Sequence, residues 1–265
     1  YSNKDKKEQL SDINISGKNN TTLTANAEGV TVGVGVASGN NKAETSNKNL
    51  TVVAVGGGTA KNVNITAENM TTNKATTDGS GGGIISVDGM AAFSKNTSSS
   101  TAIAAIKGDW NIAGKIDVKA LDTNKIILNA DSTKGAVIGY SGAKTENNIS
   151  DAVLDEELKK LLGTEEAKGT KVVLNGKISG KGSINALAKN NIDIDIDTLG
   201  SGYGAIMVQG TDADNTVNKS AKVEIKGDTD TNGKQVFEAL TEANIDMKTL
   251  VKSAGLGAFT IAKAD

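Results

Sequence analysis

The chain has 265 residues, of which 37% are hydrophobic and only 3% aromatic, and it contains no proline, cysteine or histidine. Its 29 basic residues are all lysine, and 31 acidic residues bring the net charge to −2, so there is no electrostatic footprint for nucleic acid. Lack of cysteine excludes disulfides and thiolate metal sites, and lack of histidine, cysteine and arginine excludes the common nucleophile–base pairs and phosphate clamps. We therefore expect no catalytic residue, no cofactor and no metal.

The first twelve residues (YSNKDKKEQLSD) are polar and charged, and the sequence starts with tyrosine. They do not resemble a signal peptide, and we interpret the sequence as an excerpt from a longer protein. No run of about 18 apolar residues occurs, so no membrane-spanning segment is predicted.

Two signatures recur along the chain. A short strand of alternating apolar and polar residues occupies residues 13–17 (INISG), 63–67 (VNITA), 116–120 (IDVKA) and 184–188 (INALA). A glycine-rich lead into an apolar run that ends in glycine follows at 34–39 (VGVASG), 84–89 (IISVDG), 137–142 (VIGYSG) and 205–210 (AIMVQG). The strand starts and the closing glycines share one series of steps, namely 50, 53 and 68. A partial fifth copy at 257–263 (GAFTIAK) puts Lys263 in place of the closing glycine, a further step of 53 from Gly210, so we take the period as 53.

The third step exceeds this period by 15, and the excess coincides with residues 151–163 (DAVLDEELKKLLG). Its helical spacing and terminal Gly163 predict a helical loop insertion over residues 151–168. Loops that interrupt a regular shaft often carry recognition, although apolar side chains in them can also pack on the shaft. The candidate partner-binding residues are Leu154, Leu158, Leu161 and Leu162. Helical spacing over residues 234–255 predicts a second helical excursion.

Short alternating strands between Asn, Gly, Thr and Ser turns predict an all-β fold, a right-handed parallel β-helix (β-solenoid) with short helical loop insertions. It would form a single unit over residues 1–265 with about five 53-residue repeats. At roughly 20 to 26 residues per coil, each repeat would hold two or three coils, giving on the order of ten coils and a rod about 50 Å long. Residues 192–197 (IDIDID) form the clearest strand, with isoleucines facing a thin aliphatic interior.

Three weaker signals have simpler interpretations. Asp193, Asp195 and Asp197 share one outward face, where a glycosidase pair could lie, but no aromatic sugar platform accompanies them, and we interpret them as a solvated strand. Residues 212–215 (DADN) resemble half a calcium loop without its glycine and glutamate, and a corner turn is expected there. The glycine runs at 56–58 and 79–83 lack the Lys-Ser/Thr of a phosphate loop and are expected at coil corners.

The recurring VNITA and IDVKA strands, the run at 82–89 (GGIISVDG) and the following 96–103 (NTSSSTAI) resemble the repeats of leukotoxin-type, filamentous-haemagglutinin-like exoproteins. The resemblance implies two-partner secretion through an outer-membrane transporter, a secreted or cell-surface location, and binding of host cells such as leukocytes through a surface protein or glycan. The family's secretion domain, with its Asn-Pro motifs, is not in this proline-free chain. The passenger segment of an autotransporter adhesin, a β-helical carbohydrate-active enzyme and a plain spacer remain the alternatives.

Overall fold

The computed structural model describes residues 11–87 and 91–265. Residues 1–10 of the expected single unit, which include most of the polar N-terminal stretch, and the closing Gly89 of the second signature lie outside this part. Within it the chain is almost entirely β, and all its strands pair in parallel.

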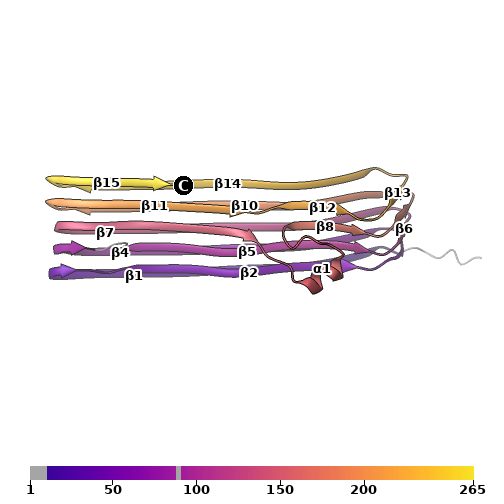
Figure 1. The fold of residues 1–265 in the computed structure, drawn as a ribbon, viewed down its shortest axis with the longest axis horizontal. Helices are drawn as coiled ribbons and strands as arrows, with labels where there is room; N and C mark the ends of the chain where they lie inside the picture. Colours follow the sequence, from indigo (N-terminus) through magenta and orange to yellow (C-terminus); the bar gives the residue numbers. More distant parts are fainter. Residues whose placement is uncertain (1–10, 88–90) are drawn as a thin grey trace, which may run out of the picture.

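One short helix interrupts a long series of strands in the described chain (Figure 1). The elements in chain order are β1 (Ile13–Ala37), β2 (Asn41–Val55), β3 (Gly58–Ala60), β4 (Val63–Val87), β5 (Ala92–Lys107), β6 (Trp110–Ile112), β7 (Lys115–Asp151), α1 (Glu156–Leu162), β8 (Thr170–Asn175), β9 (Ile178–Gly180), β10 (Ser183–Tyr203), β11 (Ile206–Asn218), β12 (Ala221–Ile225), β13 (Thr229–Thr231), β14 (Gln235–Ala254) and β15 (Gly257–Ala264).

Equivalent residues of successive repeats lie directly over one another. Ile13 pairs with Val63, Val63 with Ile116, Ile116 with Ile184, and Ile184 with Gln235. The first three of these pairings reproduce the steps of 50, 53 and 68 that were read from the sequence, so the predicted equivalence of the repeat strands is confirmed. The last step is 51, and Gly210 pairs with Ile261 rather than with Lys263, so the predicted final step of 53 is wrong.

Each repeat is a single flattened coil, not the two or three coils predicted. The chain runs out along a strand such as β1, reverses at one narrow end, returns along a strand such as β2, and turns through a short corner strand such as β3. The polar stretches that read as turns in the sequence are strand, because their inward Asn, Thr and Ser side chains bond to each other across the interior. The described residues therefore stack about five coils, roughly 20 Å at about 4.8 Å per coil, and not ten.

The interior alternates between apolar and polar zones along the strands. An apolar cluster next to the corner strands includes Ile65, Ile106, Trp110 and Ile116, and a second cluster around Ile194 lies further along. Buried Asn, Ser and Thr side chains lie between them, among them Asn69, Asn73, Asn96, Ser100 and Asn124. The expected aliphatic column is thus correct for the two clusters and wrong for the zone between them.

The two predicted helices have different outcomes. Helix α1 forms within the predicted residues 151–168, with the Asp155 side chain capping its first turn and Gly163 in the left-handed conformation (φ 68°) ending it. Residues 234–255 are not helical, because β14 pairs with β10 along its whole length. Pairing with β10 bonds one side of this segment's backbone along the length of β14, which overrides a weak local helical pattern.

Two expected corners are also strands. Residues 212–215 lie within β11, and residues 79–83 lie within β4, whereas Gly56 and Gly57 do form the corner between β2 and β3. The IDIDID strand is confirmed within β10, with Ile192, Ile194 and Ile196 buried and the three aspartates exposed. In the part of the chain that the structure describes, no helix has the length and apolar character needed to cross a bilayer.

Candidate functional site

The second sequence signature builds the narrow end of the molecule where each coil reverses, the left end in Figure 1. Large apolar side chains are exposed there in every coil. We call this surface the apolar rim; its members are Val30, Val32, Val34, Val36, Ile84, Ile85, Val87, Val137, Ile138, Tyr140, Tyr203, Ile206, Leu256 and Phe259. Contiguous exposed apolar surface is uncommon on soluble proteins and marks interaction sites.

The rim is continuous because the strands are in register. Val36 pairs with Ile85, Ile85 with Ile138, and Ile138 with Ile206, so one apolar row crosses four coils. These four side chains are 71%, 39%, 46% and 48% exposed, respectively. A second row runs beside it through Val87, Tyr140, Val208 and Phe259. The rim is therefore a stripe that runs along the stacking direction.

The apolar residues point outward at the rim because the two layers of each coil close together there. A Cβ atom placed on Gly79 would lie 2.3 Å from the carbonyl oxygen of Ala91, the residue just before the returning strand β5. Such an approach leaves no room for an inward side chain at Gly79. Many of the large apolar residues of the same segments are exposed on the outside, whereas Met207 and Lys134 are buried.

Charged groups are nearly absent from the rim segments, which cover residues 30–37, 80–87, 132–142, 201–210 and 251–259. Within these ranges the charged residues are Lys134 and the exposed Lys252. The Lys134 side chain is buried and donates to Ser86 Oγ at 2.9 Å, and burial lowers the pKa of Lys134. The rim thus presents aliphatic and aromatic surface with a single exposed charge.

The helical insertion contributes less exposed apolar surface than its sequence suggested. Leu154 and Leu162 are buried against Ile103, Ala105 and Val173 on the outer face of β5 and β8, and Leu158 packs partly on the same cluster. Leu161 is 52% exposed. Three of the four candidate leucines therefore hold the loop on the sheet, and Leu161 is the candidate available to a partner.

Buried polar contacts fasten the base of this loop. Lys171, whose side chain is fully buried, donates to the Glu166 carbonyl oxygen at 2.8 Å and lies 3.4 Å from Glu224 Oε1. Thr164 Oγ1 donates to the same Glu224 oxygen at 3.0 Å. Burial lowers the pKa of Lys171 against the opposing effect of Glu224. These contacts join the loop to β8 and β12.

Sequence reasoning missed a buried charge cluster between the two layers. Lys219 Nζ lies 2.6 Å from Asp122 Oδ2 and 3.2 Å from Asp151 Oδ1, and Ser100 Oγ also donates to Asp122. The signal that could have found part of it is the longest repeat step, because that step carries Asp151 onto the position of Lys219. The cluster is structural, since its side chains have almost no exposed surface.

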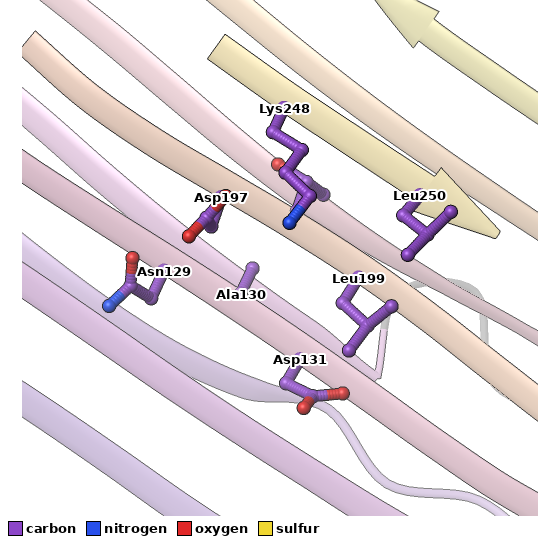
Figure 2. A pocket seen from close by; sticks show the side chains of 8 residues that line it. Asn129, Ala130, Asp131, Asp197, Leu199, Lys248 and Leu250 are labelled. Carbon is purple, nitrogen blue, oxygen red and sulfur yellow. The ribbon is translucent and has the colours of Figure 1, made fainter. Parts of the chain in front are cut away.

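The three aspartates considered as a possible glycosidase pair, Asp193, Asp195 and Asp197, are exposed on the flat outer face. Asp197 lines a shallow depression of about 250 Å³ together with Asp131, Leu199, Lys248 and Leu250 (Figure 2). Burial, and then the neighbouring Asp78, raise the pKa of Asp131. Asp193, outside this depression, accepts a hydrogen bond from Asn244 at 3.0 Å and lies 3.9 Å from Lys125 Nζ.

A lysine contacts the two aspartates of residues 212–215, whose composition resembles half a calcium loop. Lys144 Nζ lies 3.3 Å from Asp212 and 2.8 Å from Asp214, and these contacts raise the pKa of Lys144. Among residues 11–87 and 91–265, no cluster of three or more acidic groups is placed to hold a metal ion. Comparison with protein-family models, curated proteins and solved structures found no match.

Proposed function

We propose that this chain is a non-enzymatic binding and scaffold segment of a secreted or surface-displayed bacterial exoprotein. Its fold would be a right-handed parallel β-helix, and its apolar rim would contact a protein or glycan on host cells such as leukocytes. The observation that carries the proposal is the in-register apolar row of Val36, Ile85, Ile138 and Ile206. The repeat style resembling leukotoxin-type exoproteins supports the host-cell assignment.

A stack of paired strands suits a scaffold. Each internal coil has its backbone bonded to the coil on either side, and the interior is filled by clusters and side-chain ladders that cross several coils. Such an array presents the same short segment once per coil at a spacing of about 4.8 Å. Repeated apolar contacts along one stripe would add their separate small affinities, provided the partner can engage several coils together.

The test is binding of the fluorescently labelled chain to leukocytes by flow cytometry. The variant Ile85→Ser/Ile138→Ser/Ile206→Ser removes the centre of the rim, and we expect it to lower bound fluorescence at least tenfold. Ile127→Ser, a half-buried isoleucine on the flat outer face, is the matched control and should bind as the parent does. Equal binding by the triple variant, with an unchanged circular dichroism spectrum, would rule out the rim as the contact surface.

A second candidate contact is helix α1, favoured by the exposure of Leu161. Leu161→Ser in the same assay separates the two surfaces, because it leaves the rim intact. If Leu161→Ser alone abolished binding, the loop and not the rim would be the partner-binding element. Absence of binding by the parent chain itself would favour a spacer that presents other parts of an exoprotein.

The enzymatic alternative has a separate test. A β-helical carbohydrate-active enzyme would depolymerise a glycan and would lose that activity on Asp193→Asn or Asp195→Asn substitution. We expect no depolymerisation by the parent chain. For the secretion route we propose the two-partner system with its outer-membrane transporter, with autotransport as the alternative, on the resemblance alone.

A further inference from the structure

A lysine and two aspartates lie in contact inside the protein, out of reach of solvent. Lys219 Nζ lies 2.6 Å from Asp122 Oδ2 and 3.2 Å from Asp151 Oδ1, and the three side chains are 0%, 0% and 4% exposed, respectively. The main-chain carbonyl oxygens of Ser100 and Ser150 also accept from Nζ and hold it between the two carboxyl groups. The amine of the lysine is therefore fixed directly against a carboxyl group.

The neighbouring coils fill the same positions with uncharged residues. Asp122 pairs with Asn69 in the preceding coil and with Asn190 in the following one. In the returning layer Asp151 pairs with Ser100. Asparagine and serine are thus sufficient to fill these two interior rows, and burying charges in their place costs free energy. The stacking of the coils does not require the charged residues at this one place.

The two oxygens of Asp122 are held in the way that attack by an amine requires. Oδ1 accepts a hydrogen bond from Asn69 Nδ2 at 2.8 Å. Oδ2 accepts from Ser100 Oγ at 2.8 Å and from Asn124 Nδ2 at 3.0 Å. A donor on Oδ1 stabilises the negative charge that this oxygen takes up when a nucleophile adds to the carboxyl carbon. Oδ2, which faces the lysine, is the oxygen placed to leave.

Asp151 is placed to move protons. Its Oδ2 accepts hydrogen bonds from the main-chain N–H and the hydroxyl of Ser220, at 3.1 Å and 2.7 Å. Its Oδ1 faces Lys219 Nζ and has no hydrogen-bond partner in the described part of the chain. A carboxylate within reach of the reacting nitrogen can take a proton as a general base and return it as a general acid.

We propose that Lys219 and Asp122 form an amide bond between their side chains, with Asp151 as the proton-transfer group. One proton passes from the ammonium to the Asp122 carboxylate, which gives a neutral amine and a neutral acid. Nζ then adds to Cγ of Asp122, the Nζ–Cγ bond forms and the Cγ–Oδ2 bond breaks. Oδ2 leaves as water with the two protons that the nitrogen gives up, so the step needs no oxidant and no co-reactant.

Burial favours this reaction over a lasting ion pair. Ionised groups lose their hydration in the interior, which favours the neutral acid and amine that the reaction consumes. Groups held in contact in a productive orientation react as if at an effective concentration of up to about 10⁵–10⁸ M. Exclusion of bulk water also protects the amide from hydrolysis.

The bond joins the two layers of the molecule. Asp122 belongs to β7, and Lys219 belongs to the segment between β11 and β12, one coil further along the stack. The bond closes residues 122–219 into a covalent loop, which restricts the unfolded chain and keeps the coils from separating under load. This inference is independent of the rim and of host-cell binding.

Intact mass spectrometry of the denatured chain tests the proposal. We expect a mass lower than that of the sequence by one molecule of water, and proteolytic digestion should yield one branched peptide that joins Asp122 to Lys219. Lys219→Arg, which keeps the charge but not the amine, should restore the full mass. Lys171 is also fully buried beside a carboxylate, with Nζ 3.4 Å from Glu224 Oε1, and the control Lys171→Arg should keep the loss of water.

A second pair of variants tests the role of Asp151. Asp151→Asn keeps the size of the side chain and removes the proton-transfer group, so we expect the cross-linked fraction to fall at least tenfold while the circular dichroism spectrum stays that of the parent. Asp197→Asn makes the same change at an exposed aspartate of the flat outer face and should leave the cross-linked fraction unchanged. An undiminished cross-link in Asp151→Asn would contradict the assigned role.

Three further outcomes would overturn the proposal. The first is a folded parent chain whose mass equals that of its sequence. The second is a branched peptide that joins Lys219 to Asp151 instead of Asp122. The third is a loss of water that persists in Lys219→Arg, which would place the dehydration at another residue. If Lys219→Arg does not fold, the presence or absence of the Asp122–Lys219 branched peptide in the parent still decides the question.

Discussion

Lys219 Nζ lies 2.6 Å from Asp122 Oδ2, and neither side chain has any surface exposed to solvent. Asp122 comes from the outgoing part of β7 and Lys219 from the segment between β11 and β12, so the pair connects two layers and two coils. Asp151 at the end of β7 places a second carboxylate 3.2 Å from the same lysine. The lysine supplies a counter-charge to carboxylates that are buried in the interior.

Removing the cation should therefore be costly. Lys219→Met would leave Asp122 and Asp151 buried without a counter-charge, and we expect it to lower the free energy of unfolding by about 3 to 5 kcal/mol. Urea denaturation followed by circular dichroism measures the change. Lys125→Met, which removes an exposed lysine 3.9 Å from Asp193, should cost less than about 1 kcal/mol. A loss for Lys219→Met no larger than this control would show that the buried pair is not needed for stability.

The row of hydrogen-bonded asparagines in the interior should contribute to stability, because each one bonds to the next. Asn96 accepts from Asn73 at 2.7 Å and donates to Asn147 at 2.7 Å, and Asn147 donates to Asn215 in the next coil. Asn96→Ala would leave Asn73 and Asn147 each without one hydrogen bond. We expect the free energy of unfolding to fall by roughly 1 to 3 kcal/mol. The exposed pair of Asn64 and Asn14 is the control, and Asn64→Ala should stay within about 0.5 kcal/mol. Equal midpoints in urea for the two variants would contradict the argument.

Asp131 should make stability fall as pH rises through the acidic range. Burial and then Asp78 raise its pKa, so the folded state holds the proton more tightly than the unfolded chain. That contribution is fully present below the unfolded pKa and is lost as pH rises through the raised folded value. Asp131→Asn should therefore gain stability relative to the parent as the pH is raised from the acidic range to neutrality, measured by thermal unfolding at each pH. In an Asp78→Asn background the gain should shrink without vanishing; a gain that was the same at every pH would refute the account.

Leu161 and Leu162, neighbouring residues of α1, should differ in how much their truncation lowers stability. Leu162 is fully buried under the loop, and Leu162→Ala should cost about 2 to 5 kcal/mol if the loop unfolds with the stack. Leu161 is 52% exposed, and Leu161→Ala should change stability by less than about 0.5 kcal/mol. Chemical denaturation of both variants checks the contrast. Limited proteolysis near residue 160 would show whether Leu162→Ala releases the loop alone.

Repeat offsets were the most informative part of the sequence, because the step from one copy of a signature to the next is the strand register itself. The size of a coil was not predictable from alternation alone. Stretches such as residues 18–22 (KNNTT) look like turns, and only the polar partners across the interior, such as Asn49 opposite Thr21, keep them extended. The helix predicted over residues 234–255 was wrong for a similar reason. Helical spacing within one segment carries no information about the strand of the preceding coil with which that segment pairs.

The segments that form the rim could be recognised in the sequence as the second repeat signature, but their exposure could not be predicted. Their apolar runs predict strands, and nothing local indicates that their large side chains face outward. Their exposure depends on how near the two layers of the coil lie, as at Gly79 and Ala91, and this distance cannot be read from the sequence. The leucines of the insertion had the opposite outcome, because the outer face of β5 and β8 supplies an apolar surface that covers three of them.

The insertion shows how such a protein can acquire new parts. In the second coil Ser100 leads directly into Thr101, whereas in the third the equivalent Asp151 is followed by the whole segment 152–169 before Thr170 resumes the ladder. The strands before and after the insertion keep their pairing with β5. The insertion therefore leaves the strand register unchanged. We expect the equivalent joints, after Ser100 and after Lys219, to accept an inserted segment without a change in strand register.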